Sequence, residues 1–370
     1  MKKNKSTFFD KLLLLFAVLA GIGLLAGMVA ADKNPVQHIL YAFFGLAYPF
    51  FLLANLIFLL WWLLRKKWVH AIVTIVVIGV GYHTLIATFG WFGDSGQDEK
   101  ANGQLMRLMT YNVHNFKPYG AEITPEVKQK MFDVVQNQHP DVVCFQEFFT
   151  RFKGQYDTVD SLKKILGTPY YYFHPVLKSA SEAIGMAIFS KYPFENSGTI
   201  IFDNSLGNAS IYTDIRLNGQ LIRVYNIHLQ SISFDKEDYV YIDKVKGMDP
   251  QMNSTKRILK MLKSAFQKRS TQVEQMRAHM QSCKTPYVIC GDFNDTPASY
   301  AVNKMTDSLK NAFIEKGQGL GRTYNGKFPN FQIDYIATTK DFDVMNYRIV
   351  EAKLSDHFPV RSDLRLRSAN

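Results

Sequence analysis

The hydrophobic residues of this chain are concentrated near its N-terminus. Three long stretches without a charged residue cover residues 12–31, 34–64 and 68–92. About 20 apolar residues in a helix cross a hydrocarbon core, because lipid offers backbone polar groups no partner outside the helix. The pattern predicts a membrane domain over residues 1–92 with three transmembrane helices, at about 12–31, 39–64 and 68–92. The first stretch also fits a signal peptide, since lysines precede it and small residues end it.

Basic residues at the ends of these stretches predict their orientation. Four lysines precede residue 12, and Arg65-Lys66-Lys67 separates the second stretch from the third, whereas only Lys33 lies between the first and the second. Positive residues favour the cytoplasmic side of a membrane. We therefore expect a multi-pass membrane protein with a cytoplasmic N-terminus. Three crossings then place the remainder of the chain outside the cytoplasm, which in a bacterium is the periplasm or the exterior.

After a short polar linker at residues 93–103, the pattern changes to short apolar runs separated by turns and amphipathic stretches. An N-terminal helix signal at Thr124-Pro125 and a helical periodicity over residues 254–281 predict two helices. The Asn218-Gly219 dipeptide predicts a hairpin over residues 214–229. Residues 231–253 have weak periodicity and are expected to form a variable loop. The strand candidates are residues 105–113, 142–146, 186–189, 287–290 and 333–337.

Composition narrows the class of protein. Although 47% of the residues are hydrophobic, the mean hydropathy is only -0.10, so the region after the linker is an ordinary globular sequence. A disordered chain and a small disulfide scaffold are excluded. The formal net charge is +11, of which about +7 falls after residue 100, and this favours anionic partners such as phosphate esters, nucleic acid or membrane surfaces. The three cysteines have no zinc-like spacing.

Polar residues recur at the ends of the strand candidates, where an α/β scaffold presents its site. Together they supply carboxylates for a hard divalent cation, amides for phosphate oxygens and two histidines for proton chemistry. Magnesium prefers oxygen ligands, so Glu147 with help from Asp356 or Asn112 would suffice. The candidates are Asn112, Gln146, Glu147, His228, Asp292, Asn294, Asp334, Asp356 and His357.

The order of these residues and their local sequences resemble the endonuclease/exonuclease/phosphatase family, over about residues 104 to 366. The resemblance implies an α/β (α+β) fold, a four-layer sandwich of two mostly antiparallel β-sheets flanked by helices. It also implies a magnesium-dependent phosphoric ester hydrolase over residues 104–370, using Mg²⁺ or Mn²⁺. The segments that carry it are Met109-Thr110-Tyr111-Asn112-Val113, Phe145-Gln146-Glu147, 185–193, 225–229, 291–294, 333–336 and 355–359.

Carried over position by position, the resemblance implies the following roles. Glu147 is the principal metal ligand, with Asn112 beside it at the metal and the phosphate. Asp292 orients or deprotonates the attacking water, and Asn294 holds that water and a phosphate oxygen. His228 contacts the scissile phosphate or protonates the leaving group. His357 hydrogen-bonds the phosphate, with Asp334 orienting its ring and Asp356 available as a second metal contact.

Three hypotheses follow. The first is a membrane-anchored phosphodiesterase that acts outside the cytoplasm on a phosphate ester such as a phospholipid or lipid-linked headgroup. The second is an anchored extracytoplasmic nuclease for DNA or RNA, which a basic groove with strong salt dependence would favour. The third is a catalytically inactive binding module, although every expected polar position is filled. The expected partners are the phosphate-ester substrate and the lipid bilayer, and no obligate protein partner is inferred.

Overall fold

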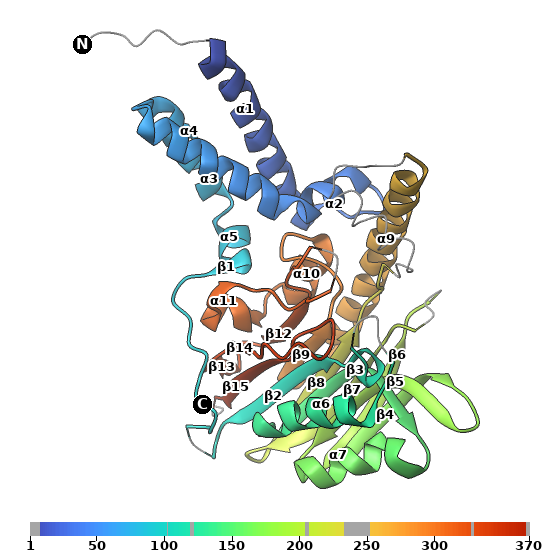
Figure 1. Cartoon of the computed structure of the whole chain (residues 1–370). Helices are drawn as coiled ribbons and strands as arrows, with labels where there is room; N and C mark the ends of the chain where they lie inside the picture. Colours follow the sequence, from blue (N-terminus) through green and yellow to red (C-terminus); the bar gives the residue numbers. More distant parts are fainter. Residues whose placement is uncertain are drawn as a thin grey trace.

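Two large β-sheets lie face to face in the computed structural model (Figure 1), which describes residues 8–101, 103–118, 122–203, 207–232, 252–326 and 329–367. Within these residues the first sheet contains β6 (Phe194–Ile201), β7 (Ala209–Leu217), β8 (Gln220–His228), β9 (Tyr287–Asp292), β10 (Lys310–Asn311) and β12 (Asp334–Thr338). The second contains β2 (Met106–Asn112), β3 (Val142–Arg151), β4 (Tyr170–Lys178), β5 (Glu182–Ser190), β13 (Phe342–Val344), β14 (Arg348–Ile349) and β15 (Val360–Leu366).

Both sheets are mostly antiparallel. In the described residues the first sheet has the order β10-β12-β9-β8-β7-β6, and the second has the order β13-β15-β2-β3-β5-β4 with β14 beside β15. In the first sheet β8 pairs in parallel with β9, and in the second sheet β2 pairs in parallel with β3. The two strands of each pair therefore end at the same edge of their sheet. Polar residues at these strand ends are therefore brought close together.

Successive side chains of each strand point to opposite faces of its sheet, so the hydrophobic core has one layer between the sheets and one on each outer face. Cys144 and Ile188 face Val224 and Val288 between the sheets, whereas their sequence neighbours point outward. On one outer face these neighbours pack against α6 (Pro125–Asn137) and α7 (Thr158–Leu166). On the other outer face Tyr225 and Ile289 pack against α9 (Met252–Ser282) and α10 (Tyr300–Thr306). The four-layer sandwich predicted from the sequence is confirmed.

The local signals also correspond to observed elements. Thr124 Oγ1 accepts the Val127 N–H at 3.3 Å and caps α6, and the periodicity over 254–281 corresponds to α9. Leu217 pairs with Gln220, leaving Asn218 and Gly219 as a two-residue turn with positive φ values of 52° and 85°. Most of the loop expected at 231–253 lies outside the described residues.

The N-terminal helices differ from the predicted spans. They are α1 (Phe8–Val29), α2 (Ile39–Leu46), α3 (Tyr48–Leu64), α4 (Trp68–Val80) and α5 (Tyr82–Thr88), with a 3₁₀ turn at Ala30–Asp32. Among the described residues, the helix over Phe8–Asp32 is by itself long and apolar enough to cross a membrane. The other two segments qualify only as bent pairs, because α2 and α3 meet at 57° and α4 and α5 at 73°.

The prediction of three continuous transmembrane helices is therefore wrong for the second and third stretches. Pro49, in the first turn of α3, lacks the N–H that a helix continuing from α2 would need. Gly81 separates α4 from α5 in a non-helical conformation. The third stretch also ends early, because Phe89–Gly90 forms β1 and pairs with β11 (Gly319–Leu320).

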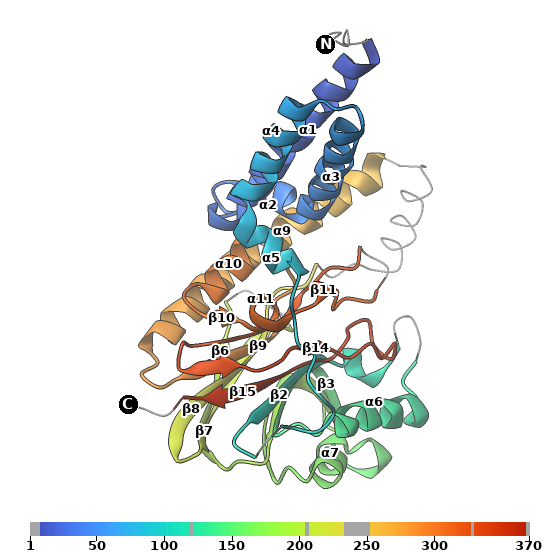
Figure 2. The same cartoon turned by 90° about the vertical axis from the view of Figure 1, so that its left-hand side faces the viewer.

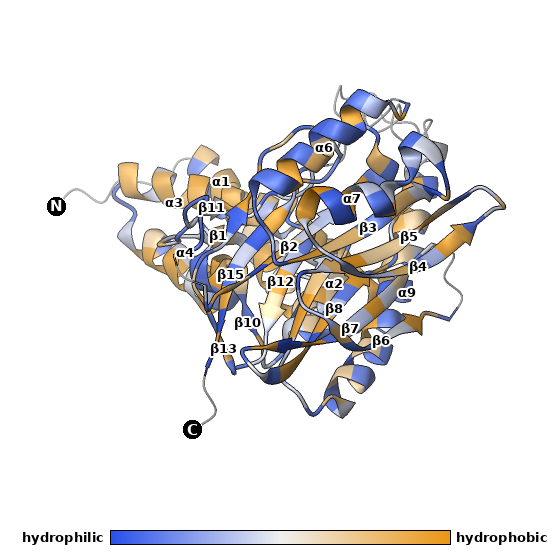
Figure 3. Cartoon of the chain, turned by 90° about the horizontal axis from the view of Figure 1, so that it is seen from below, coloured by the Kyte–Doolittle hydropathy of each residue, from blue (hydrophilic) through white to orange (hydrophobic). Residues whose placement is uncertain are grey.

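The helical bundle is attached to the sandwich on the side of α9 and α10 (Figure 2). The Ser270 hydroxyl of α9 donates to Asn34 Oδ1 at 2.9 Å, and Lys304 of α10 lies 3.6 Å from Asp32. In Figure 3 α1, α3 and α4 are coloured mostly as hydrophobic, whereas α6 and α7 show mixed colours. Large hydrophobic side chains of the bundle are exposed, which is typical of helices that contact lipid.

Candidate active site

Strand register brings candidate residues from both sheets to one edge of the sandwich. In the first sheet, His228 lies opposite Asp292, and Asp292 lies opposite Asp334 on its other side. In the second sheet, Asn112 pairs with Gln146, so Glu147 follows directly at the same edge. A hydrogen bond of 3.0 Å from Asn112 Nδ2 to Asp292 Oδ2 joins the two groups.

A β-bulge directs Glu147 into the site. The register of β3 shifts between Phe145 and Phe148, and Glu147 has a positive φ of 50°. Such a conformation is costly for a residue with a side chain and is found mainly at functional sites. The side chain of Glu147 retains 29% exposure in a strand whose neighbouring residues are buried. The bulge therefore exposes a carboxylate to the pocket.

Asp292 lies at the centre of a hydrogen-bond network. Its Oδ1 accepts the Asn294 backbone N–H at 2.8 Å, and its Oδ2 accepts both the Asn294 and Asn112 side-chain amides at 3.0 Å. Burial and the neighbouring Asp334 raise the pKa of Asp292 to about 7, although His357 opposes the shift. A carboxylate with a pKa near neutrality is suited to accept a proton at physiological pH.

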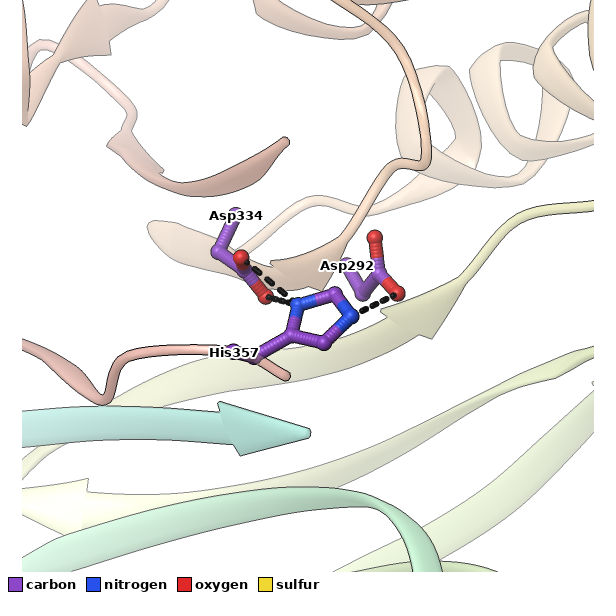
Figure 4. A group of neighbouring side chains, drawn as sticks. All are labelled: Asp292, Asp334 and His357. Carbon is purple, nitrogen blue, oxygen red and sulfur yellow. Dashed lines mark hydrogen bonds and ion pairs between the residues drawn. The ribbon is translucent and has the colours of Figure 1, made fainter. Parts of the chain in front are cut away.

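His357 lies between two carboxylates (Figure 4). Its Nδ1 lies 3.0 Å from Asp334 Oδ2, and its Nε2 lies 3.7 Å from Asp292 Oδ2. Burial alone would lower the pKa of His357, but the two carboxylates raise it well above its ordinary value. The Asp334 backbone N–H is fixed by Thr323 Oγ1 at 3.0 Å. The imidazole is thus held charged and in one orientation.

Glu147 forms a second cluster with His114 and Asp356. His114 Nδ1 lies 3.4 Å from Glu147 Oε2 and 3.6 Å from Asp356 Oδ1. Burial would raise the pKa of Glu147, but the hydrogen bond from His114 and the nearby imidazoles of His228 and His357 lower it to about 2. This carboxylate therefore stays ionised, as a metal ligand must.

His228 is buried, and burial lowers its pKa. Its Nε2 lies 3.7 Å from Asp292 Oδ2 and 3.9 Å from Glu147 Oε1, and within the described part of the chain it has no hydrogen-bond partner. A buried polar atom without a hydrogen-bond partner is costly, and this one lies next to Asp292 and Glu147 of the pocket lining, so a ligand held by these carboxylates could satisfy it.

The candidates surround a pocket of about 220 Å³. The candidates that line it are Glu147, Asp292, Asn294, Asp356 and His357, and His114 lines it beside them. Asn112, His228 and Asp334 contact these residues from behind the lining. The Asn112 side-chain oxygen accepts the His114 backbone N–H at 3.1 Å, while its amide donates to Glu147 Oε1 at 3.3 Å and to Asp292. Asn112 is thus a donor that positions the two carboxylates.

Two sets of side chains could hold a divalent cation. Asp292, Asp334 and His357 can bring one ligand atom each within 4.8 Å of one another. However, Asp334 is already paired with His357 Nδ1, and this histidine is held protonated, which opposes metal binding. Glu147 and Asp356 both face the pocket and offer the oxygen ligands that magnesium prefers. The second set fits the metal better.

Sequence reasoning did not single out His114. It follows β2 in a 3₁₀ turn (His114–Phe116) that has non-helical dihedral angles inside, with φ values of 43° at His114 and 57° at Asn115. The turn directs the His114 imidazole toward the carboxylates of Glu147 and Asp356. The signal available in the sequence was the position of His114, two residues after Asn112 at a strand end.

A sandwich with carboxylates, amides and imidazoles at the ends of strands from both sheets defines a class of hydrolase that handles phosphate esters. The family comparison agrees: the model described as "Endonuclease/Exonuclease/phosphatase family" matches residues 109–357. The chain belongs to this family of hydrolytic phosphoesterases, which commonly use a divalent metal. A second family model, described as a domain of unknown function, matches residues 10–88. No curated protein matches the chain.

Solved structures show the same fold at low identity. An endonuclease/exonuclease/phosphatase from Beutenbergia cavernae is 20% identical, with a TM-score of 0.50 and 72% of each chain covered. The human nocturnin catalytic domain is 18% identical, with a TM-score of 0.50, covering 71% of this chain and 95% of that one. A functionally unknown protein from Enterococcus faecalis is 14% identical, with a TM-score of 0.53, covering 71% of this chain and all (100%) of that one.

Proposed function

We propose that the chain is a membrane-anchored, divalent-metal-dependent phosphodiesterase. The observation that carries this proposal is the meeting of Glu147, Asp292 and His357 in one pocket, with His228 Nε2 buried beside them and without a hydrogen-bond partner among the described residues. In-line attack on a phosphate ester needs neutralisation of charge at the phosphate and a positioned water. The imidazoles of the pocket can donate hydrogen bonds to the charged phosphate, and Asp292 can accept a proton from the positioned water.

Glu147 and Asp356 would hold a Mg²⁺ or Mn²⁺ ion, and Asn112 would keep the carboxylate of Glu147 in place. The bound ion would supply Lewis-acid stabilisation of the negative charge on the phosphate. His114 contacts both ligand carboxylates, so its imidazole would orient them. Side chains of this kind, which contact metal ligands from outside, strongly affect metal affinity.

Asp292 would take a proton from water as the water oxygen bonds to phosphorus, with Asn294 holding that water and a phosphate oxygen. The ester P–O bond breaks as the new bond forms, and the departing alkoxide takes a proton from a solvent water, whose hydroxide is neutralised by the proton held on Asp292, so that an alcohol and a phosphomonoester remain. His357, kept charged by Asp334, would donate a hydrogen bond to a phosphate oxygen. His228 would contact the scissile phosphate or donate to the leaving group through Nε2.

Replacement of Asp292 tests this mechanism. Asp292→Asn keeps the shape of the side chain but removes the proton acceptor, so kcat on bis(p-nitrophenyl) phosphate should fall by about 10²–10⁴-fold. Asp307→Asn is the matched control, because the Asp307 side chain is 54% exposed and pairs only at the surface with Arg277. Equal activity of Asp292→Asn and Asp307→Asn at unchanged Tm would contradict the mechanism.

We also propose that the polypeptide crosses the membrane three times, with two bent spans, and that the active site lies outside the cytoplasm. Asp10 at the start of α1 lies 3.5 Å from Arg65 and 3.7 Å from Lys67, so the start of α1 and the basic segment 65–67 share one end of the bundle. The sandwich is attached at the opposite end. The positive-inside rule then assigns the basic end to the cytoplasm. A reporter fused after Asn370 that is active only in the cytoplasm would refute this orientation.

A further inference from the structure

The catalytic pocket has a second, apolar wall that the chemistry described above does not use. Besides the carboxylates and imidazoles, the lining of the pocket includes Leu46, Leu262, Phe266, Pro329, Phe331 and Ile333, which we call its apolar wall. Hydrolysis of a phosphate ester requires none of these side chains. A pocket whose lining combines charged groups with several hydrocarbon side chains is complementary to an amphiphile.

This apolar wall is built jointly by the membrane segment and the sandwich. Leu46 ends α2, whereas Leu262 and Phe266 lie on one face of α9. Phe43 of α2 packs edge-on against Phe266 with ring centroids 5.5 Å apart. A Cβ added at Gly45 would lie 3.1 Å from the Ala298 carbonyl oxygen, so α2 approaches the sandwich backbone closely. The contact fixes Leu46 at the pocket.

The wall continues onto the surface of the bundle that we assign to lipid. Phe50, in the first turn of α3, packs edge-on against Phe331 of the pocket at 6.3 Å between ring centroids, and its side chain is 56% exposed. Leu53 follows on the same side of α3 and is 57% exposed. Apolar side chains therefore extend from the pocket to the outside of α3, and the buried Arg269, which stacks on Phe266 at 5.1 Å, is paired with Asp295 at 2.9 Å.

Basic residues lie on α9, the helix that supplies Leu262 and Phe266 to the pocket. The N-terminal half of α9 extends beside α2 (Figures 1 and 2) and exposes Lys256, Lys260 and Lys263. Leu259, in the same turns, is 46% exposed. Lysines close to a bilayer surface attract lipid phosphate groups, and a helix with both kinds of residue is suited to the interface.

From this arrangement we infer that the substrate is a membrane lipid with a phosphodiester headgroup. Its phosphate would lie at the carboxylates and imidazoles, and its hydrocarbon chain would lie along Leu46 and Phe331 toward Phe50. The inference rests on the proposed phosphodiesterase activity and names the substrate class of that site. Leu46 is a specificity-determining residue under this proposal, although it lies in the membrane segment.

Alkyl p-nitrophenyl phosphates with ethyl, octyl and dodecyl chains test the inference on the full-length protein in nanodiscs. For the unaltered protein kcat/KM should rise with chain length, by about tenfold for every two methylene groups that become buried. In Leu46→Gln the dodecyl-to-ethyl ratio of kcat/KM should fall by about tenfold, because the amide must be desolvated against the chain. Leu46→Met should restore the ratio.

Leu40→Gln is the matched control, since Leu40 lies on the same helix, is 70% exposed and does not line the pocket. It should keep the ratio of the unaltered protein. A kcat/KM independent of chain length, an unchanged ratio in Leu46→Gln, or faster cleavage of single-stranded DNA than of the dodecyl ester would overturn the lipid inference while leaving the phosphodiesterase proposal intact. Failure to hydrolyse any ester with Mg²⁺ or Mn²⁺ would instead contradict the proposed function, and the inference with it.

Discussion

Asp292 and Asp334 are carboxylates on neighbouring strands, and their partners give them different chemistry. Asp292 accepts hydrogen bonds from two asparagine side chains and faces the pocket. Asp334 is turned away from the pocket and pairs with His357. Burial raises the pKa of Asp292, and this effect outweighs the opposing charge of His357. One carboxylate is therefore placed to accept a proton, and the other to keep a histidine charged.

The pairing of His357 with Asp334 predicts a change in pH dependence. Asp334 raises the pKa of His357, so Asp334→Asn should lower it. If the charged imidazole holds the phosphate, activity is lost as pH rises through this pKa, and the alkaline limb of the kcat/KM profile should move to lower pH. Asp341→Asn, on an exposed turn, should leave the limb in place. An unmoved limb in Asp334→Asn would show that His357 does not act as a cation.

Backbone conformations at the site account for residues whose geometry the sequence did not reveal. Glu147, Asn294 and His114 all have positive φ values. Family resemblance identified Glu147 and Asn294 by their sequence context, but not the bulge that exposes Glu147. His114 had no such context, and the 3₁₀ turn that returns it to Glu147 depends on tertiary contacts. Residue identity was predictable here, whereas side-chain direction was not.

At the scale of elements, the hairpin of β7 and β8 positions His228 at the end of its second strand. Gly219 has a φ of 85°, and a Cβ added there would meet no atom within 4 Å. Gly219→Ala should therefore lower the free energy of unfolding by about 1 kcal/mol for conformational reasons alone. Gly103→Ala, also in open space but without a positive φ, is the control. Thermal or urea unfolding measures both, and equal Tm values would argue against the type I′ turn.

Strands with clear alternation or strong turn signals were predictable, and others were not. β2, β9 and the β7–β8 hairpin follow apolar runs or an Asn-Gly turn. β4 is partly exposed along most of its length and has no buried-exposed alternation, so its pattern gives no strand signal. The bends between α2 and α3 and between α4 and α5 were missed because hydropathy reports composition, not the effect of Pro49 or Gly81 on a helix.

At the scale of the whole molecule, a buried ion pair ties together the strands that carry the site. Arg107 of β2 donates to Asp363 of β15 at 2.6 and 2.9 Å, with side chains 0% and 2% exposed. Burial alone would raise the pKa of Asp363, but hydrogen bonds from Arg107 and Asn346 lower it below its usual value. Its stabilising effect is therefore present above a pH of about 4 and lost as the pH falls.

Removing this charge should destabilise the protein. Asp363→Asn removes the carboxylate that pairs with Arg107 and lies 3.8 Å from Arg361, both of them buried, and the free energy of unfolding should drop by about 3 kcal/mol at neutral pH. Because this carboxylate no longer titrates, the difference between the variant and the unaltered protein should shrink as the pH falls below about 4. Asp343→Asn is the control, since it removes a carboxylate whose partners Arg365 and Arg367 are exposed. Equal unfolding midpoints for the two variants would contradict this assignment.

The relation between the membrane segment and the sandwich could not be anticipated from sequence. Hydropathy indicated an anchor, and family resemblance indicated a phosphoesterase, but neither placed Leu46 of α2 in the lining of the pocket. That contact depends on the bend at Pro49 and on the close approach of Gly45 to Ala298. The N-terminal helical bundle thus forms part of the pocket in the folded molecule.

The most direct test of the account is metal-dependent hydrolysis of bis(p-nitrophenyl) phosphate by the full-length protein, before and after EDTA and on return of Mg²⁺ or Mn²⁺. We predict turnover that EDTA abolishes and the metal restores, and a loss of Mn²⁺ affinity in Glu147→Gln of more than about tenfold, with Glu182→Gln unaffected. Turnover that survives EDTA, or equal Mn²⁺ affinity in the two variants, would contradict a metal site at Glu147 and the phosphodiesterase mechanism built on it.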